Sequence, residues 1–174
     1  MKGFLSLAAL AAACATAAGD APAQFNLVIV ASDSSINGSA VVDTNNNEID
    51  IEGVLQPFMG SGDPTVFYFD SATGHLATNS TLTGSERFGY TLYSNFTSSL
   101  RFDDVSNISG DVAYPKFTVG DDGLLSAGGN LTWAWCPDDF NVGDGWYLPG
   151  SVTLGSIAKG CEKIVGLTAV VPSS

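Results

Sequence analysis

The sequence predicts an all-β fold, a single compact antiparallel sandwich or barrel of about eleven short strands. Outside residues 1–18, no stretch shows the sustained 3.6-residue apolar repeat of an amphipathic helix. Short runs rich in Val, Ile, Phe, Tyr and Thr recur instead, separated by Gly, Asn, Asp and Ser. Many short strands with frequent turns are typical of a sandwich or barrel. The length of 174 residues suits one domain, which we place at residues 19–174.

The predicted strands are short runs in which apolar, β-branched and aromatic side chains recur. In chain order they are 25–31 (FNLVIVA), 39–43 (SAVVD), 48–54 (EIDIEGV), 65–69 (TVFYF), 75–78 (HLAT), 88–93 (FGYTLY), 116–119 (KFTV), 124–126 (LLS), 131–136 (LTWAWC), 145–148 (GWYL) and 164–171 (IVGLTAVV).

Three turns predict hairpins between neighbouring strands. Residues 43–47 (DTNNN), 70–74 (DSATG) and 120–123 (GDDG) each separate two apolar runs. Gly and Asn tolerate the positive φ angles that such turns require.

The second and third hairpins share a pattern of Phe, an apolar residue, polar or small residues, Gly and Leu. It predicts either a weak internal repeat, as in a β-trefoil, or simply two hairpins that direct an aromatic side chain inward. The matching positions are Phe67, Phe69, Gly74 and Leu76 in one hairpin, and Phe117, Val119, Gly123 and Leu125 in the other.

Residues 1–18 are interpreted as a secretory signal peptide. Lys2 supplies the positive charge, residues 4–13 form a short apolar segment, and small residues at 15–18 suit cleavage. A bacterial lipoprotein would place a cysteine where Cys14 stands, but residues 11–13 lack the usual leucine. The C-terminal stretch 168–174 is too short and too polar for a GPI signal. We therefore expect a secreted, extracellular protein whose attachment to a cell wall, where it occurs, is non-covalent.

The charge balance excludes two classes of partner. The chain has 18 acidic and 6 basic residues, a formal net charge of −12. Such a surface repels nucleic-acid phosphates and anionic membranes, so neither is expected as a partner. We interpret the acidity as an aid to solubility. With 45% hydrophobic and 14% charged residues, the chain can fill a core.

Two cysteines remain once Cys14 leaves with the signal. Cys136 and Cys161 are an even pair in an oxidising compartment, which predicts one disulfide. The chain-entropy model gives it roughly 3–4 kcal/mol of stabilisation. A zinc site is the rival interpretation, but two cysteines with one distant histidine fall short of a ligand set.

Five Asn-x-Ser/Thr sequons indicate passage through a glycosylating secretory pathway and predict a surface position for each acceptor. Turns rich in Ser, Thr and Asn also produce such triplets by chance, so the expectation is that at least three are used. The acceptors are Asn37, Asn79, Asn95, Asn107 and Asn130.

No catalytic residue, cofactor or metal is expected. His75 is the one histidine, and a Ser-His-Asp triad would need it. No Gly-x-Ser-x-Gly motif accompanies it. Because His75 follows a turn glycine, we interpret it as a solvated turn histidine.

A strand from 48 to 52 would place three carboxylates on one face. Glu48, Asp50 and Glu52 alternate with Ile49 and Ile51. They could form a cation site or a glycosidase acid/base pair. The preferred interpretation is the solvent face of an amphipathic strand.

Residues 43–47 begin like a calcium-binding loop. Asp43, Asn45 and Asn47 have the required spacing, but Glu48 stands where glycine is needed and Val54 where glutamate is needed. The EF-hand interpretation is therefore rejected.

Aromatic side chains flank the segment of Cys136. Exposed aromatics stack on sugar rings, so they could form a carbohydrate platform; residues two apart on a strand more often line a core or pack on a disulfide. These residues are Trp133, Trp135, Trp146 and Tyr147.

The block from 117 to 148 carries a resemblance to a known family. It reads FTVGDDGLLSAGG, then WAWCP, then GDGWYL, and Gly160-Cys161 follows; near the start stand FNLV at 25–28 and Ser-x-Ile-Asn-Gly at 34–38. This resembles the small secreted fungal proteins around the phialide cell-wall protein PhiA, some of which are described as IgE-binding antigens. Fungal relatives include inducers of the plant hypersensitive response. A further cysteine pair of the family has no counterpart here.

The resemblance implies a non-enzymatic glycoprotein of the fungal cell wall or extracellular space, with a structural or interaction role. Its expected partners are cell-wall polysaccharide or a host surface. A carbohydrate-binding module and a small carboxylate-dependent hydrolase are the alternatives.

Overall fold

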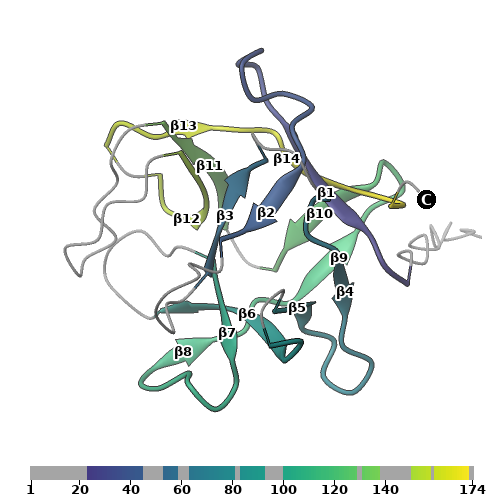
Figure 1. Ribbon diagram of the computed structural model, residues 1–174. Coiled ribbons are helices and arrows are strands. Elements are labelled where there is room, and N and C mark those ends of the chain that lie inside the picture. Colours follow the sequence, from purple (N-terminus) through teal and green to yellow (C-terminus); the bar gives the residue numbers. More distant parts are fainter. Residues whose placement is uncertain are drawn as a thin grey trace, which may run out of the picture.

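The computed structural model describes residues 23–44, 53–58, 63–80, 83–92, 100–128, 131–137, 150–157 and 159–172. These residues form antiparallel strands and no helix, so the all-β prediction is confirmed (Figure 1). The strands are β1 (Asn26–Val30), β2 (Val41–Asp43), β3 (Gly53–Pro57), β4 (Phe67–Phe69), β5 (Leu76–Asn79), β6 (Glu86–Leu92), β7 (Arg101–Asp104), β8 (Val112–Ala113), β9 (Phe117–Val119), β10 (Leu124–Ala127), β11 (Thr132–Cys136), β12 (Ser151–Gly155), β13 (Glu162–Lys163) and β14 (Gly166–Val170).

The strands form two sheets. The first has the order β1-β14-β10-β9, and the second has the order β13-β11-β12-β3-β7-β6-β5-β4, with β2 beside β3 and β8 beside β6. A bridge between Phe25 and Phe67 joins β1 to β4 and so links the two sheets.

The pairings repeat along the chain in three units, β1–β4, β5–β9 and β10–β14. The last strand of each unit pairs with the first of the next, as β4·β5, β9·β10 and β14·β1, and each unit contributes an inner pair, β2·β3, β6·β7 or β11·β12. These pairings are compatible with the β-trefoil alternative, but no pairing joins β5 to β9 among the described residues. Figure 1 shows β6–β8 of the middle unit at the bottom and β11–β13 at the upper left.

The second and third hairpins pair in the same way, as both interpretations of their shared pattern predict. Phe69 pairs with Leu76 in one hairpin, and Val119 pairs with Leu125 at the matching place in the other. In both hairpins the turn glycine has a positive φ, 72° at Gly74 and 78° at Gly123. A residue with a Cβ atom would be strained in this left-handed region.

The core lies between the sheets and is rich in aromatic rings. Phe25 and Phe69 have ring centroids 5.4 Å apart, and Phe67 and Phe102 have centroids 5.6 Å apart. Leu and Ile side chains of β1, β5 and β14 complete it at full burial. Burial of this apolar surface is the main favourable term in folding.

The strand prediction missed two central strands. The sequence of β7 is RFDD, and three charged residues of four argued against a strand. The sequence of β12 is SVTLG, whose polar and glycine positions resembled a loop, yet all five residues are buried between β11 and β3. The predicted strand at 48–54 begins only at Gly53 in the described part, and 145–148 lies outside the described residues. Tertiary pairing overrides local composition in both missed strands.

No helix long and apolar enough to cross a membrane occurs in the described part of the chain.

Candidate functional site

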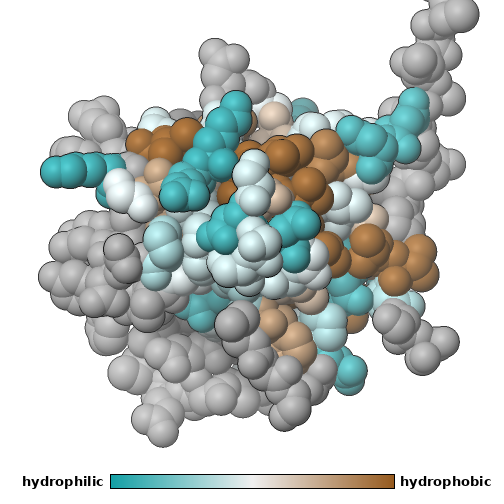
Figure 2. Space-filling view, turned by 90° about the horizontal axis from the view of Figure 1, so that it is seen from above, coloured by the Kyte–Doolittle hydropathy of each residue, from teal (hydrophilic) through white to brown (hydrophobic). Residues whose placement is uncertain are grey.

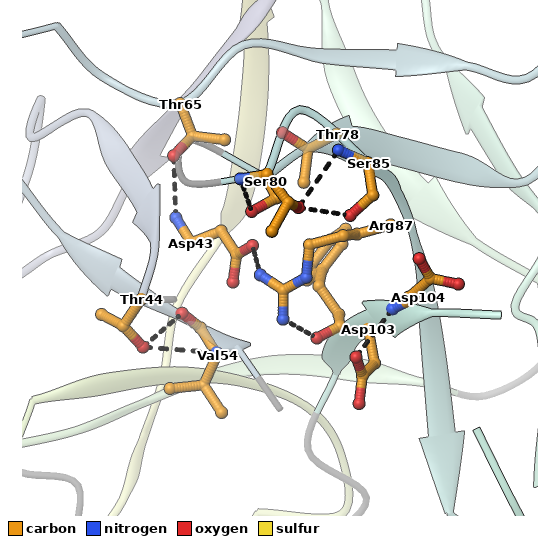
Figure 3. A network of polar contacts seen from close by, with 12 residues as sticks. Asp43, Thr44, Val54, Thr65, Thr78, Ser80, Ser85, Arg87, Asp103 and Asp104 are labelled. Carbon is orange, nitrogen blue, oxygen red and sulfur yellow. Dashed lines mark hydrogen bonds and ion pairs between the residues drawn. The ribbon is translucent and has the colours of Figure 1, made fainter. Parts of the chain in front are cut away.

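A buried ion pair joins the first two units of the fold. Asp43 ends β2, and Arg87 is the second residue of β6. The Arg87 Nη1 group donates to Asp43 Oδ2, and the side chains are 4% and 5% exposed, respectively (Figure 3). A buried charge is tolerated only when it is paired and hydrogen-bonded. This contact therefore depends on both partners staying in place.

Other groups complete the surroundings of the pair. The second guanidinium nitrogen of Arg87 donates to the backbone carbonyl of Phe102 on β7. The backbone N–H of Asp43 donates to Thr65 Oγ1 at 2.9 Å. Asp103 is also buried and adds a negative charge nearby. Arg87 thus holds β2 and β7 against β6.

Gly53 is needed for this arrangement because of the space it leaves. A Cβ atom at position 53 would lie 1.7 Å from Asp43 Oδ1 and 2.9 Å from Arg87 Nη1. No side chain is compatible with such distances unless the ion pair moves. The glycine at the start of β3 is therefore part of the site.

Burial dominates the electrostatics of Asp43. It raises the pKa of the carboxyl to about 7, because a charged carboxylate loses its hydration; Arg87 opposes the rise and Asp103 adds to it. The Asp43 Oδ1 atom is buried without a hydrogen-bond partner. A carboxyl with such a pKa has the proton affinity of a general acid or base, but its enclosure denies a substrate access.

Stability is expected to fall as the pH rises from 5 to 8. Between about pH 4 and pH 7 the folded protein holds a proton on Asp43 that the unfolded chain has lost, so the native state binds more protons. This stabilisation is complete below the unfolded pKa and is lost as the pH passes the folded pKa. We expect a free energy of unfolding about 2–3 kcal/mol lower at pH 8 than at pH 5, measured by urea denaturation.

The control for this prediction is Asp43→Asn, which removes the titrating group. The pH dependence should flatten in this variant. Hydrogen bonds from nearby Ser or Thr residues lower the pKa values of the exposed Asp33, Asp70 and Asp104 carboxyls. These three groups therefore change the free energy of unfolding only at lower pH. Equal wild-type stability at pH 5 and pH 8 would contradict the raised pKa of Asp43.

The predicted disulfide is present. Cys136 ends β11 and is bonded to Cys161, which directly precedes β13, with Cα atoms 4.2 Å apart. The two strands pair next to it, at Ala134 with Lys163 and at Trp135 with Glu162. The bond therefore anchors the edge strand β13 to the sheet.

Trp133 and Trp135 line the core, the more common arrangement for residues two apart on a strand, and do not form a sugar platform. They are 6% and 9% exposed and belong to the core. The Trp133 Nε1 group donates to the Leu125 carbonyl at 3.0 Å, and its ring stacks on Phe117 with centroids 6.2 Å apart. A buried ring has no free face for a sugar. The other proposed platform residues, Trp146 and Tyr147, lie outside the described residues.

His75 is half-buried, so the interpretation as a solvated turn histidine is wrong. Its ring stacks on Tyr114 with centroids 4.5 Å apart and planes 8° apart, and it meets Phe88 edge-on at 6.1 Å. The stack brings the start of β5 against the segment before β9, where the described strands make no pairing. The histidine thus packs the beginning of the middle unit against its end.

The structure describes three of the five sequon acceptors, and all three are exposed as predicted. The side-chain oxygen of Asn37 accepts from the Ala31 N–H, and that of Asn79 accepts from the Tyr68 hydroxyl. Asn107 differs, because its side-chain nitrogen, the atom that a glycan would modify, donates to Asp103 at 3.2 Å. Asn95 and Asn130 lie outside the described residues.

The predicted carboxylate face at 48–52 and the loop positions Asn45 and Asn47 also lie outside the described residues. Among the residues that are described, no group of three or more His, Cys, Asp or Glu side chains is placed to hold a metal ion.

A pocket of about 240 Å³ opens in the third unit. It is lined by β10, by residues 131–133 and by residues 163–165. Asp43 and Arg87 are not part of it.

Sequence reasoning missed the ion pair. The predicted strand 88–93 begins after Arg87, and Asp43 ends the predicted strand 39–43 and begins the turn that follows. The two residues are 44 positions apart, and no local pattern indicates that they meet.

No protein-family model, no curated protein and no solved structure matches this chain.

Proposed function

We propose that this protein is a non-enzymatic secreted glycoprotein of the fungal cell wall or extracellular space, with a structural or interaction role. The observation that carries the proposal is the disulfide between Cys136 and Cys161. Structural disulfides persist in oxidising compartments and are rare in the cytosol. The predicted signal at 1–18 and the resemblance of the block at 117–148 to the phialide cell-wall protein family agree with this location.

The exposed sequons support the same route. Asn37 and Asn79 are exposed. In the contacts described above, each uses its side-chain oxygen and not the nitrogen that a glycan would modify. Glycosylation at such positions adds bulk to the surface without disturbing the core.

The arrangement of the acidic groups supports a role without catalysis. Asp43 is the one described carboxyl whose pKa is raised to about 7, and it is enclosed by Arg87 and Gly53 instead of facing a cleft. A hydrolase would place such a group where a substrate can reach it.

Expression of the full chain in a fungal host tests the proposal. We expect disulfide-bonded protein in the medium and in detergent extracts of the wall. Endoglycosidase should lower its apparent mass, and the shift should shrink by one step in each of Asn37→Gln and Asn79→Gln. Asn107→Gln is the matched comparison, because the side-chain nitrogen of Asn107 already donates a hydrogen bond to Asp103. Intracellular retention, two free thiols and an unchanged mass after endoglycosidase would together refute it.

A further inference from the structure

The turn between β1 and β2, residues 31–39, contains a glycine that its backbone requires. Gly38 has a φ angle of 82°, a left-handed conformation that a residue with a Cβ atom adopts only under strain. The residue before it is Asn37, so the turn carries the one Asn-Gly pair of the sequence. Figure 1 shows this turn projecting from the top of the molecule, and Figure 2, seen from above, shows mainly polar surface at the centre of the view.

An asparagine followed by glycine is prone to deamidation, because no side chain shields the glycine nitrogen. In this reaction the Gly38 nitrogen forms a bond to Cγ of Asn37, and the bond between Cγ and Nδ2 breaks. Ammonia leaves with the proton of the Gly38 N–H. Water then opens the resulting cyclic imide at either carbonyl, which leaves aspartate or isoaspartate at this position.

Two hydrogen bonds of the folded protein hold the reacting groups. The Gly38 N–H donates to the Ile29 carbonyl at 2.9 Å, and the Ala31 N–H donates to Asn37 Oδ1 at 3.0 Å. The first bond must break before the glycine nitrogen can lose its proton and attack, and the second fixes the amide that it would attack. The folded turn therefore opposes the reaction although Asn37 is exposed to water.

The rest of the turn is closed by contacts at both its exposed and its buried side. The Asn37 N–H donates to the Asp33 carbonyl at 3.0 Å, and the Asp33 carboxylate accepts from the Ser35 N–H at 2.8 Å. Ile36 is 5% exposed and belongs to the core, so it anchors the turn. Local opening of residues 31–39 would therefore free both reacting groups together.

We infer that Asn37 is a latent deamidation site, closed in the folded protein and reactive when the turn 31–39 opens. Conversion to isoaspartate lengthens the main chain before Gly38 by one carbon atom, so the modified turn cannot restore its native contact with Ile29. Opening of the turn is thereby made permanent. The inference concerns chains without a glycan on Asn37. It goes beyond the proposed extracellular role and does not depend on it.

Peptide mass spectrometry of the disulfide-bonded protein tests the inference. The protein comes from a host that adds no N-glycans and is kept at pH 8 with or without concentrated urea. Because the chemistry is slow compared with the motions of a turn, its rate follows the population of the open form. In urea, Asn37 should be converted before any other asparagine. In the folded protein its conversion should be at least about tenfold slower.

A variant of the turn shows whether its opening controls the rate. Asp33→Ala removes the acceptor of the Ser35 N–H and leaves the Asn-Gly pair in place, so conversion of Asn37 in the folded protein should be about three- to tenfold faster. Asp70→Ala is the matched control, because it removes a carboxylate that accepts from the Thr73 N–H in another turn. It should leave the rate unchanged. In urea the wild type and both variants should react equally fast.

The inference is overturned if Asn37 reacts as fast in the folded protein as in urea, or if another asparagine reacts first in urea. It is also overturned if Asp33→Ala reacts no faster than the wild type. An equal acceleration by Asp33→Ala and Asp70→Ala would overturn it too, since the rate would then follow the stability of the whole fold and not the opening of this turn.

Discussion

Replacement of Arg87 by methionine is expected to lower the free energy of unfolding at pH 8 by about 3–5 kcal/mol, the usual cost of removing one partner of a buried ion pair. Methionine keeps most of the side-chain volume but leaves the Asp43 carboxylate without its cation and the Phe102 carbonyl without its donor. Urea denaturation at pH 8 measures the loss.

The same variant should lose at most half as much at pH 5. Asp43 holds a proton there, so less charge is left uncompensated. The double variant Asp43→Asn with Arg87→Met removes both charges and should recover most of the stability at pH 8. A loss below about 1 kcal/mol for Arg87→Met at pH 8 would show that the pair contributes no more than an exposed one.

Removal of the disulfide is expected to cost roughly 3–4 kcal/mol, because the bond restricts the unfolded chain between positions 136 and 161. The test is the double variant Cys136→Ser with Cys161→Ser, compared with the oxidised wild type by thermal and urea unfolding. β13 should also lose protection from hydrogen exchange before the other strands, since it pairs only with β11 in the described structure.

A control must separate the loss of the disulfide from the replacement of the two cysteine side chains. Wild-type protein with both thiols reduced should match the double variant to within about 1 kcal/mol, because both lack the cross-link. Equal stability of the oxidised wild type and the double variant would mean that the cross-link contributes nothing to the fold.

For the two tryptophans of β11, the strand pattern correctly predicts a shared face but does not decide whether that face is buried or exposed. Alternation places Trp133 and Trp135 on one face of β11. Whether that face meets solvent or core depends on β10 and β14, which come from other parts of the chain. The core was the more common outcome for such residues, and it is the one observed.

The burial of charged residues in the second unit is even harder to predict from the sequence. Arg87 and Asp103 would be placed on the surface by composition alone, because isolated charges are costly to bury. The partners of Arg87 come from β2 and β7, so the cost of burying it is offset only after the strands have paired. Asp103 accepts hydrogen bonds from its neighbours Asp104 and Asn107 instead. Residue chemistry can propose such a pair only when the register is known.

The sequence by itself determined the β class, the cysteine pairing and the match between two hairpins. These depend on local chemistry: strand-forming runs, turn glycines such as Gly74 and Gly123, and two cysteines left to pair. Only the tertiary structure decided the buried ion pair of Asp43 and Arg87, the burial of the tryptophans, the central place of β7 and β12, and the pocket of the third unit. The physical reason is that burial and ion pairing arise between strands distant in the chain, and their energies depend on which side chains the pairing brings together.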